Sequence, residues 1–209
     1  KSSIFNFWWL DGRYTKLTED LKKYFSEAAL IKYRVFIEVE YFLQLSSIKI
    51  EQLRGISKNQ LKDISKIATE ISEKDILEIK RIEKITNHDV KAVEYFIKNK
   101  FDKINLSKYK EFIHFGLTSQ DINNTASPLL FMDALNGCFY PELNSLIKKL
   151  NELSVNWKDI SMLARTHGQP ASPTKLGKEV NVFKVRLEEQ INLLKKIPNS
   201  GKFGGCLLY

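Results

Sequence analysis

Apolar residues recur every three or four positions along most of the chain, which is the spacing of one face of an α-helix. The first clear example lies between residues 26 and 46. Its apolar positions are Leu30, Tyr33, Ile37 and Tyr41. The pattern predicts a long helix here, with further helices to follow.

Short polar stretches mark where these helices begin. The sequence SKNQ at residues 57–60 has the pattern of a capping box and predicts a helix to about residue 71. SEKD at 72–75 predicts another start, and TNHD at 86–89 interrupts the pattern before a fresh helix. We expect Asn87 or Asp89 to cap that helix, because both side chains suit the position.

Two long apolar stripes follow in the second half of the chain. The first runs from Leu129 to Leu153 and contains Pro141, where we expect a kink. The second belongs to a helix that we expect to open at Ser172-Pro173, as a side-chain cap followed by proline at the first helical position.

No convincing alternation of period two is present, so we expect an all-α protein. Residues 1–111 are expected to form a small helical N-terminal domain, and residues 112–209 the start of a long-helix bundle. Two long stripes cannot bury each other completely. We therefore expect partners for them, either from more sequence or from other subunits.

Composition narrows the class of protein. The formal charge is +8, but the 27 lysines are scattered and often lie near acids, so no basic stripe of the kind that binds nucleic acid is present. An anionic metabolite fits this charge better, although a merely solvated surface fits as well. Two distant cysteines indicate neither a metal site nor a disulfide framework and favour the cytoplasm. No apolar run is long enough for a membrane span.

Four short polar stretches interrupt or open the predicted helices, and the first two of them are candidates for binding anions. In LDGRY at residues 10–14, Arg13 and Tyr14 could clamp a phosphate or carboxylate, or simply form a turn with a surface arginine. In the stretch around His88, the free N–H groups at the helix start could bind an anion beside the imidazole. The alternative is that His88 only caps the helix or packs in the core.

The third stretch, HFGLTSQDINN at residues 114–124, also resembles a helix start. The hydroxyls of Thr118 and Ser119 would lie beside unpaired backbone donors, an arrangement that suits a carboxylate. Capping without a ligand is the alternative. His114 lies between two apolar neighbours, and we interpret it as a packed core histidine.

The fourth stretch, MLARTHGQPASP at residues 162–173, is the densest cluster of small polar groups in the chain. Gly168 allows a close backbone approach and two prolines stiffen the turn. His167 would be held on a rigid loop between two long helices, where it could act as a general acid or base. A purely structural turn is the alternative.

Together, DGRY, ITNHDVKAVEY, EFIHFGLTSQDINN and RTHGQPASPTKLGKE resemble, in order and approximate spacing, the bacterial-type adenylosuccinate lyase family of the fumarase/aspartase superfamily. The resemblance runs from about Leu10 to Gly201. It implies β-elimination of fumarate from adenylosuccinate, giving AMP, and from the succinyl-carboxamide ribotide of purine nucleotide biosynthesis. It also implies a homotetramer whose active sites combine segments of three subunits. No metal or organic cofactor, nucleic acid or membrane is implied.

The resemblance assigns roles to residues of this chain. It makes His167 the general acid that protonates the leaving nitrogen, with Thr166 contacting a substrate carboxylate beside it. The remaining implied contacts are with the succinyl carboxylates (Thr118 and Ser119), the phosphate-bearing end (Arg13 and Tyr14) and the nucleotide pocket (Asn87, His88 and Asp89).

One part of the family pattern has no counterpart here. The family's catalytic serine lies in a loop of the form S-S-x-M-P-x-K-x-N, which this sequence does not contain. We therefore expect the chain to be an N-terminal portion, truncated before that loop and inactive alone. The alternatives are another lyase of the superfamily, such as argininosuccinate lyase, a catalytically dead helical scaffold, or a basic nucleic-acid-binding bundle.

Overall fold

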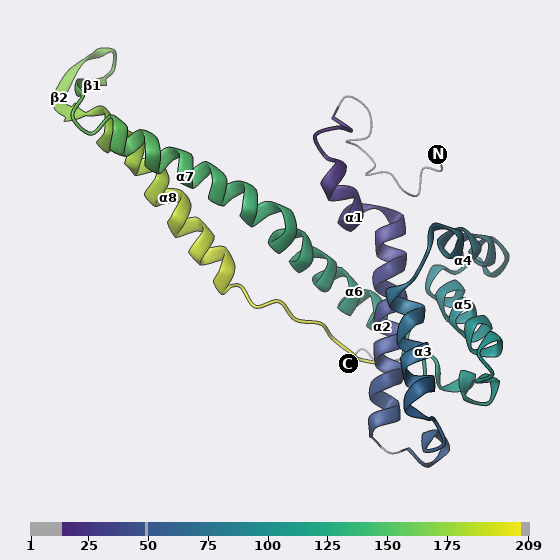
Figure 1. Ribbon diagram of the computed structural model, residues 1–209. Helices are drawn as coiled ribbons and strands as arrows, with labels where there is room; N and C mark the ends of the chain where they lie inside the picture. Colours follow the sequence, from purple (N-terminus) through teal and green to yellow (C-terminus); the bar gives the residue numbers. More distant parts are fainter. Residues whose placement is uncertain (1–13, 49, 206–209) are drawn as a thin grey trace. The chain divides into compact units, whose positions relative to one another are not determined.

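The computed structural model describes residues 14–48 and 50–205, which form α-helices and one two-stranded sheet (Figure 1). The expected all-α class is confirmed, and the small sheet is an addition that the sequence pattern did not predict. The helices are α1 (Lys22–Phe25), α2 (Glu27–Ser47), α3 (Lys58–Thr69), α4 (Glu73–Thr86), α5 (Asp89–Lys103), α6 (Ser119–Ala134), α7 (Tyr140–Asn156) and α8 (Leu176–Lys196). The strands are β1 (Ser161–Thr166) and β2 (Gln169–Lys175), and the shorter helical segments are η3 (Glu19–Leu21), η4 (Glu51–Leu53), η5 (Ser107–Phe112) and η6 (Leu135–Phe139).

The chain forms two compact units. The first contains residues up to 133 together with 200–205, and the second contains 134–199. The sequence predicts a different division, between an N-terminal domain that ends at residue 111 and a long-helix bundle that begins at residue 112. That division stays a prediction, because it concerns a bundle of which this chain would form only the start. None of the helices in the described ranges is both long and apolar enough for a membrane span.

The first unit is built around α2, which packs against α3 and α5. Its core includes Val35 and Phe42 of α2 and Ile64 of α3, all almost completely buried. Phe42 meets Phe101 of α5 edge to face, with ring centroids 4.9 Å apart. Burying each such side chain contributes on the order of 1.5–3 kcal/mol, so this core accounts for much of the stability of the unit.

Side-chain caps begin three of these helices, and the sequence predicts the caps of two of them, α3 and α4. Ser26 accepts a hydrogen bond from the backbone N–H of Ala29 at the start of α2. Full capping boxes open α3 (Ser57 with Gln60) and α4 (Ser72 with Asp75). Each cap satisfies backbone donors that the first helical turn leaves without a partner.

The long stripe from residue 129 to 153 is helical throughout but changes its winding just before Pro141. Residues Leu135–Phe139 form a π-helical segment, and the N–H of Tyr140 donates to the carbonyl of Leu135. A π segment adds a residue to one turn, which is one way to relieve the clash that proline causes within an α-helix. The structure shows this π-helical segment directly before the proline, and the kink predicted at Pro141 itself stays a prediction.

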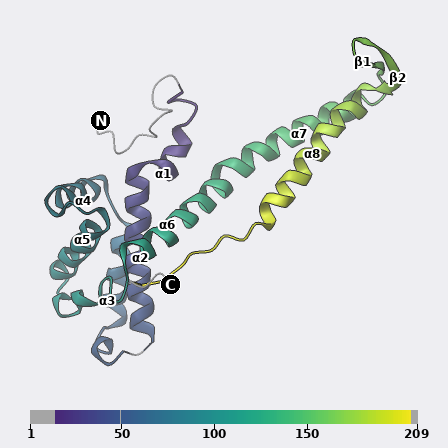
Figure 2. The same ribbon diagram turned by 180° about the vertical axis from the view of Figure 1, so that it is seen from behind.

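The second unit is dominated by α7 and α8, which lie side by side in both views (Figures 1 and 2). Gly177 makes their close approach possible. A Cβ atom there would lie 2.2 Å from the carbonyl oxygen of Ser154. The expected start of the second helix at Ser172-Pro173 was wrong: both residues belong to β2, and α8 begins at Leu176 without a side-chain cap.

Candidate functional site

The turn between α4 and α5 carries three of the predicted site residues. Asn87 ends α4 in the left-handed conformation, with φ 52°, and His88 is the N-cap of α5. The prediction that Asn87 or Asp89 would cap α5 was therefore wrong. The imidazole takes that place because its Nδ1 accepts the backbone N–H of Lys91, at 3.1 Å.

The other ring nitrogen of His88 faces Ser119. Nε2 of His88 lies 3.3 Å from Oγ of Ser119, which begins α6. A neutral imidazole carries its proton on one nitrogen only. Because Nδ1 accepts from Lys91, Nε2 carries the proton and donates to the serine hydroxyl. The structure thus brings two predicted site residues, 31 positions apart in sequence, into contact.

Asp89 is held beside them by Arg34 of α2. The guanidinium Nη2 lies 2.7 Å from Oδ2 of Asp89, and Nε donates to Oδ1 of Asn123 at 2.9 Å. Partial burial raises the pKa of Asp89, but the N–H of Val90 and the charge of Arg34 outweigh it, so the pKa lies below its ordinary value. Asp89 is therefore ionised near neutral pH and fixed in orientation.

Thr118 is engaged by a carboxylate of the protein itself. Oδ2 of Asp121 accepts the N–H of Thr118 at 2.8 Å and its hydroxyl at 3.2 Å. Oδ1 accepts the N–H groups of Gly204 and Gly205, at 2.6 and 3.2 Å. The expected unpaired donor at Thr118 is thus already satisfied, whereas the hydroxyl of Ser119 faces His88.

His114 lies at the beginning of the same loop. Its side chain is only 15% exposed, and its Nδ1 lies 2.5 Å from Oε1 of the fully buried Glu38. Burial lowers the pKa of His114, but the hydrogen bond and charge of Glu38 outweigh it and the pKa is raised. Burial also raises the pKa of Glu38. The interpretation of His114 as a packed histidine omitted this charged partner.

The predicted acid His167 lies in the second unit, at the tip of the hairpin formed by β1 and β2. The strands pair as far as Thr166 and Gln169, leaving His167 and Gly168 as a two-residue turn with φ 49° and 77°. Positive φ at both positions is what a type I′ turn requires, and it suits the twist of antiparallel strands. The expected loop between two helices is therefore a β-hairpin, and both Thr166 and His167 are exposed.

The remaining predicted contacts are only partly described. Arg13 lies outside the described residues. Tyr14 is 47% exposed, and its carbonyl accepts the N–H groups of Leu17 and Thr18 at 2.9 and 3.1 Å. Their predicted role at the phosphate end of a ligand stays a prediction.

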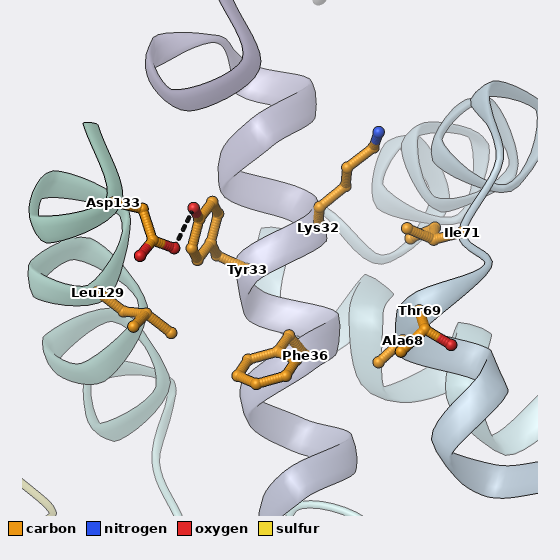
Figure 3. A pocket seen from close by; sticks show the side chains of 8 residues that line it. All are labelled: Lys32, Tyr33, Phe36, Ala68, Thr69, Ile71, Leu129 and Asp133. Atoms are coloured by element: carbon orange, nitrogen blue, oxygen red, sulfur yellow. Dashed lines mark hydrogen bonds between the residues drawn. The ribbon is translucent and has the colours of Figure 1, made fainter. Parts of the chain in front are cut away.

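A polar cavity of about 530 Å³ adjoins the turn before α5. It is lined by Lys80, Glu83, Lys84, Asn87, His88 and Asp89. A second cavity of about 370 Å³ lies across α2 and contains no predicted site residue; there Tyr33 points toward Asp133 and donates to it at 2.7 Å (Figure 3). Across residues 14–48 and 50–205, no group of three acidic, histidine or cysteine side chains is placed to hold a metal ion.

Three side chains that bind and orient the candidate site residues of the first unit were not predicted from the sequence. Arg34 and Glu38 lie within an apolar helical pattern, and the only signal was that charged residues occupy its buried face. Asp121 was seen only as part of a helix start. The arrangement supplies a neutral imidazole, a hydroxyl, an ionised carboxylate and a polar cavity, which together suit a polar, hydrogen-bonding ligand.

Comparison with known proteins gives consistent results. A family described as "Lyase" matches residues 12–207. The chain is 50% identical over 203 residues to adenylosuccinate lyase of Dictyostelium discoideum and 39% identical over 200 residues to that of Escherichia coli strain K12, covering 94% and 95% of this chain. It spans 44% of the length of either relative.

Solved structures share the fold at lower identity. A fumarate lyase from Mesorhizobium sp. BNC1 superposes with a TM-score of 0.70 at 22% identity, covering 90% of this chain and 42% of that one. A 3-carboxy-cis,cis-muconate lactonizing enzyme from Pseudomonas putida gives 0.68 at 17% identity, with the same coverage. At these identities the likeness concerns the fold alone.

Proposed function

The chain belongs to the lyase family whose pattern spans residues 12–207, and from that membership we propose that it forms part of an adenylosuccinate lyase. The reaction is elimination of fumarate from adenylosuccinate, giving AMP, and from the succinyl-carboxamide ribotide. The observation that carries the proposal is the 50% identity to a curated adenylosuccinate lyase over 94% of this chain. The contact between His88 and Ser119 supports it, because these residues belong to two motifs that the family resemblance places at one site.

The chemistry that this reaction demands can be divided among the residues. A proton must leave carbon next to a carboxylate, and the departing purine nitrogen must receive one. We assign the second step to His167, whose ring is exposed at the tip of a short hairpin and held there by turn geometry. Thr166, directly before it, is assigned to a substrate carboxylate.

The other assignments concern binding. We propose that Ser119 and Thr118 face the succinyl carboxylates, that Asn87, His88 and Asp89 line the nucleotide pocket, and that Arg13 and Tyr14 bind the phosphate end. Because Asp121 occupies the donors of Thr118, Ser119 is expected to make the stronger of the two carboxylate contacts. Positive charge and N–H donors around the carboxylates would stabilise the dianion that forms as the proton leaves.

The base that removes the carbon-bound proton is not assigned to any residue of this chain. The family's serine loop has no counterpart in these 209 residues, and the chain spans less than half the length of its relatives. We propose that a cytoplasmic homotetramer supplies the base from a longer chain, and that these residues alone do not catalyse the reaction. The exposed apolar side chains of α7 and α8 support assembly.

The experiment that tests this function uses the His167→Asn variant. Asparagine also accepts positive φ, and Asn-Gly is the most favoured type I′ turn, so the hairpin is expected to survive while the imidazole is lost. Each form of the chain is mixed with an Escherichia coli adenylosuccinate lyase whose own acid histidine is replaced, and fumarate release is measured. Mixed assemblies are expected to regain activity with the unaltered chain and to lose it by at least about 100-fold with the variant, the scale of general acid–base catalysis.

Three outcomes would each contradict one part of the proposal. Substantial fumarate release by the unaltered chain alone would refute its expected inactivity. Release from argininosuccinate but not from adenylosuccinate in the mixed assemblies would assign the chain to a different lyase. Equal activity with the unaltered and variant chains would remove His167 from the mechanism.

A further inference from the structure

One face of α2 carries three polar side chains directed at the segments of the proposed site. Arg34, Glu38 and Tyr41 are spaced four and three residues apart, so they share one side of the helix. Arg34 and Glu38 are 7% and 1% exposed, although charged side chains are rarely buried unless they are paired. Two buried charges among Val35, Ile37 and Val39 require a physical reason.

Arg34 connects two segments of the site to one another. Its guanidinium reaches Asp89 at 2.7 Å and the side chain of Asn123 at 2.9 Å. Asp89 begins α5 directly after His88, and Asn123 lies one turn after Ser119 in α6. The planar guanidinium of Arg34 therefore fixes the starts of α5 and α6 relative to each other. The contact between His88 and Ser119 depends on the distance between these two helix starts.

Glu38 and Tyr41 hold the loop that leads into Ser119. Oε1 of Glu38 lies 2.5 Å from Nδ1 of His114, and the hydroxyl of Tyr41 donates to the carbonyl of Phe115 at 2.8 Å. His114 has φ 60°, a left-handed conformation that costs a residue other than glycine energy unless its surroundings impose it. The two contacts supply that constraint, because they hold His114 and the adjacent Phe115, where the chain turns.

We propose that Arg34, Glu38 and Tyr41, here named the α2 stripe, align the segment 87–89 with the segment 114–119, and that Glu38 is a positioning residue acting through His114. The inference rests on the proposed function only in taking these two segments as the substrate-binding site. It assigns the α2 stripe no contact with substrate. Its role is to set the separation between the imidazole of His88 and the hydroxyl of Ser119.

A packing role alone does not account for a buried carboxylate at position 38. Oε2 of Glu38 has no hydrogen-bond partner, and Glu94 of α5 adds a second buried carboxylate whose charge acts on both Glu38 and His114. Lys91 and Lys98 lie 2.8 and 3.0 Å from Glu94 and balance its charge. A neutral side chain of the same shape would fill the space without desolvating a charge. What it would lose is the charge-assisted bond that fixes His114.

The test compares Glu38→Gln with Glu40→Gln in the 209-residue chain without any nucleotide. Glutamine keeps the volume of Glu38, and Glu40 is a partly exposed position two residues along the same helix. NMR follows the imidazole titration of His114 and the cross-peak between the ring of His88 and the β protons of Ser119. Glu38→Gln is expected to lower the pKa of His114 and to weaken or abolish the cross-peak, whereas Glu40→Gln leaves both unchanged.

A second variant, Arg34→Lys, tests the distance between His88 and Ser119 through a different residue of the α2 stripe. Arg34→Lys keeps the positive charge but cannot serve Asp89 and Asn123 with one planar group. It is expected to weaken the cross-peak without changing the titration of His114. If the cross-peak persists in both Glu38→Gln and Arg34→Lys while helical circular dichroism is retained, the α2 stripe does not position the site.

The outcome is independent of whether the proposed function is right. No substrate enters the NMR measurement, so failure of the fumarate assay would leave the α2 stripe intact as an alignment device. In a mixed assembly that does turn over, Glu38→Gln is expected to raise KM more than it lowers kcat, because it displaces binding groups rather than His167. An equal KM in both forms would contradict the role of Glu38 in positioning the groups that bind substrate.

Discussion

His88 serves two neighbours at once through its two ring nitrogens. Nδ1 caps α5 by accepting from Lys91, and Nε2 faces the hydroxyl of Ser119. The contact at Nδ1 requires the neutral ring, because a protonated imidazole would direct a donor at the N–H of Lys91. The stability of α5 and the geometry of the proposed nucleotide pocket are therefore coupled at one side chain.

Replacing His88 separates these two roles. His88→Ala removes the cap and is expected to lower the free energy of unfolding by about 1 kcal/mol, whereas His88→Asn retains a good cap and is expected to lose only a few tenths. Urea unfolding measures the difference. Equal losses in the two variants would show that the hydrogen bond to Lys91 does not contribute to stability.

Asp121 predicts a dependence of stability on pH. Burial raises its pKa, but the N–H groups of Thr118, Gly204 and Gly205 outweigh it, so the pKa in the folded chain lies below the ordinary value. A group with a lowered pKa adds stability above the pKa of the unfolded chain, and this contribution disappears as the pH falls through the folded value. The contribution of Asp121 is therefore complete at pH 7 and is lost in strong acid.

Asp121→Asn tests that sign. At pH 7 the variant is expected to be less stable by about 1–3 kcal/mol, because an amide group faces donors that the carboxylate accepted. As the pH falls below about 3.9, the ordinary value for this carboxyl, the difference should shrink. Asp159→Asn, at an exposed position, serves as the control. A difference that grows as the pH falls below that value would contradict the assigned sign.

At the scale of elements, helix starts with serine caps were predictable and the hairpin was not. Ser57 and Ser72 predict the starts of α3 and α4, because a capping box depends only on residues within one turn of the helix. The hairpin was missed because its turn is His-Gly rather than Asn-Gly, and because β2 contains Pro170 and Pro173. A two-stranded ribbon tolerates these prolines, since each strand has an edge where no backbone donor is needed.

The pairing of α7 with α8 depends on the absence of a side chain at position 177. Any Cβ atom there would meet backbone atoms of Ser154 and Lys158, which cannot move independently of α7. Gly177→Ala is therefore expected to destabilise the second unit by about 1–3 kcal/mol, the usual cost of overpacking, despite the better helix propensity of alanine.

Thermal unfolding followed by circular dichroism measures that effect. Ser172→Ala, at an exposed strand position of the same unit, is the matched control and should leave the transition nearly unchanged. An unchanged or higher transition temperature for Gly177→Ala would mean that α7 and α8 do not approach as closely as described.

For the molecule as a whole, the helical class and the lyase resemblance predicted from the sequence are confirmed, whereas the site segments that it names stay predictions. The sequence could not predict how the segments are held, because Arg34, Glu38 and Asp121 act over separations of 55 to 89 residues or through partners that have no local pattern. Residues with local signals, such as His88 and Ser119, could be named as candidates from the sequence, and the structure places these two in contact. Residues whose contacts exist only in the folded chain could not be named.

Because apolar side chains are exposed on α7 and α8, we expect the chain to associate with copies of itself or with longer relatives. Leu146, Val155, Phe183 and Leu193 are each about half exposed. Light scattering is expected to give a mass above that of the 24.3 kDa monomer, rising with concentration. Phe183→Asp should reduce the mass, whereas Gln190→Asp adds the same charge at an exposed polar position and should not. A monomer at all concentrations would contradict this expectation.

The carboxylate of Asp121 gives the proposed site a resident anion. It already accepts hydrogen bonds from the N–H groups of Thr118, Gly204 and Gly205, so these donors have an acceptor when no ligand is bound. The loop can therefore keep one shape in the empty and the occupied enzyme, and little ordering entropy is left for the substrate to overcome. The same arrangement restricts how a substrate carboxylate can bind. It has to bind side chains such as Ser119, because at the N–H groups it would compete with the carboxylate of Asp121, which is part of the chain itself.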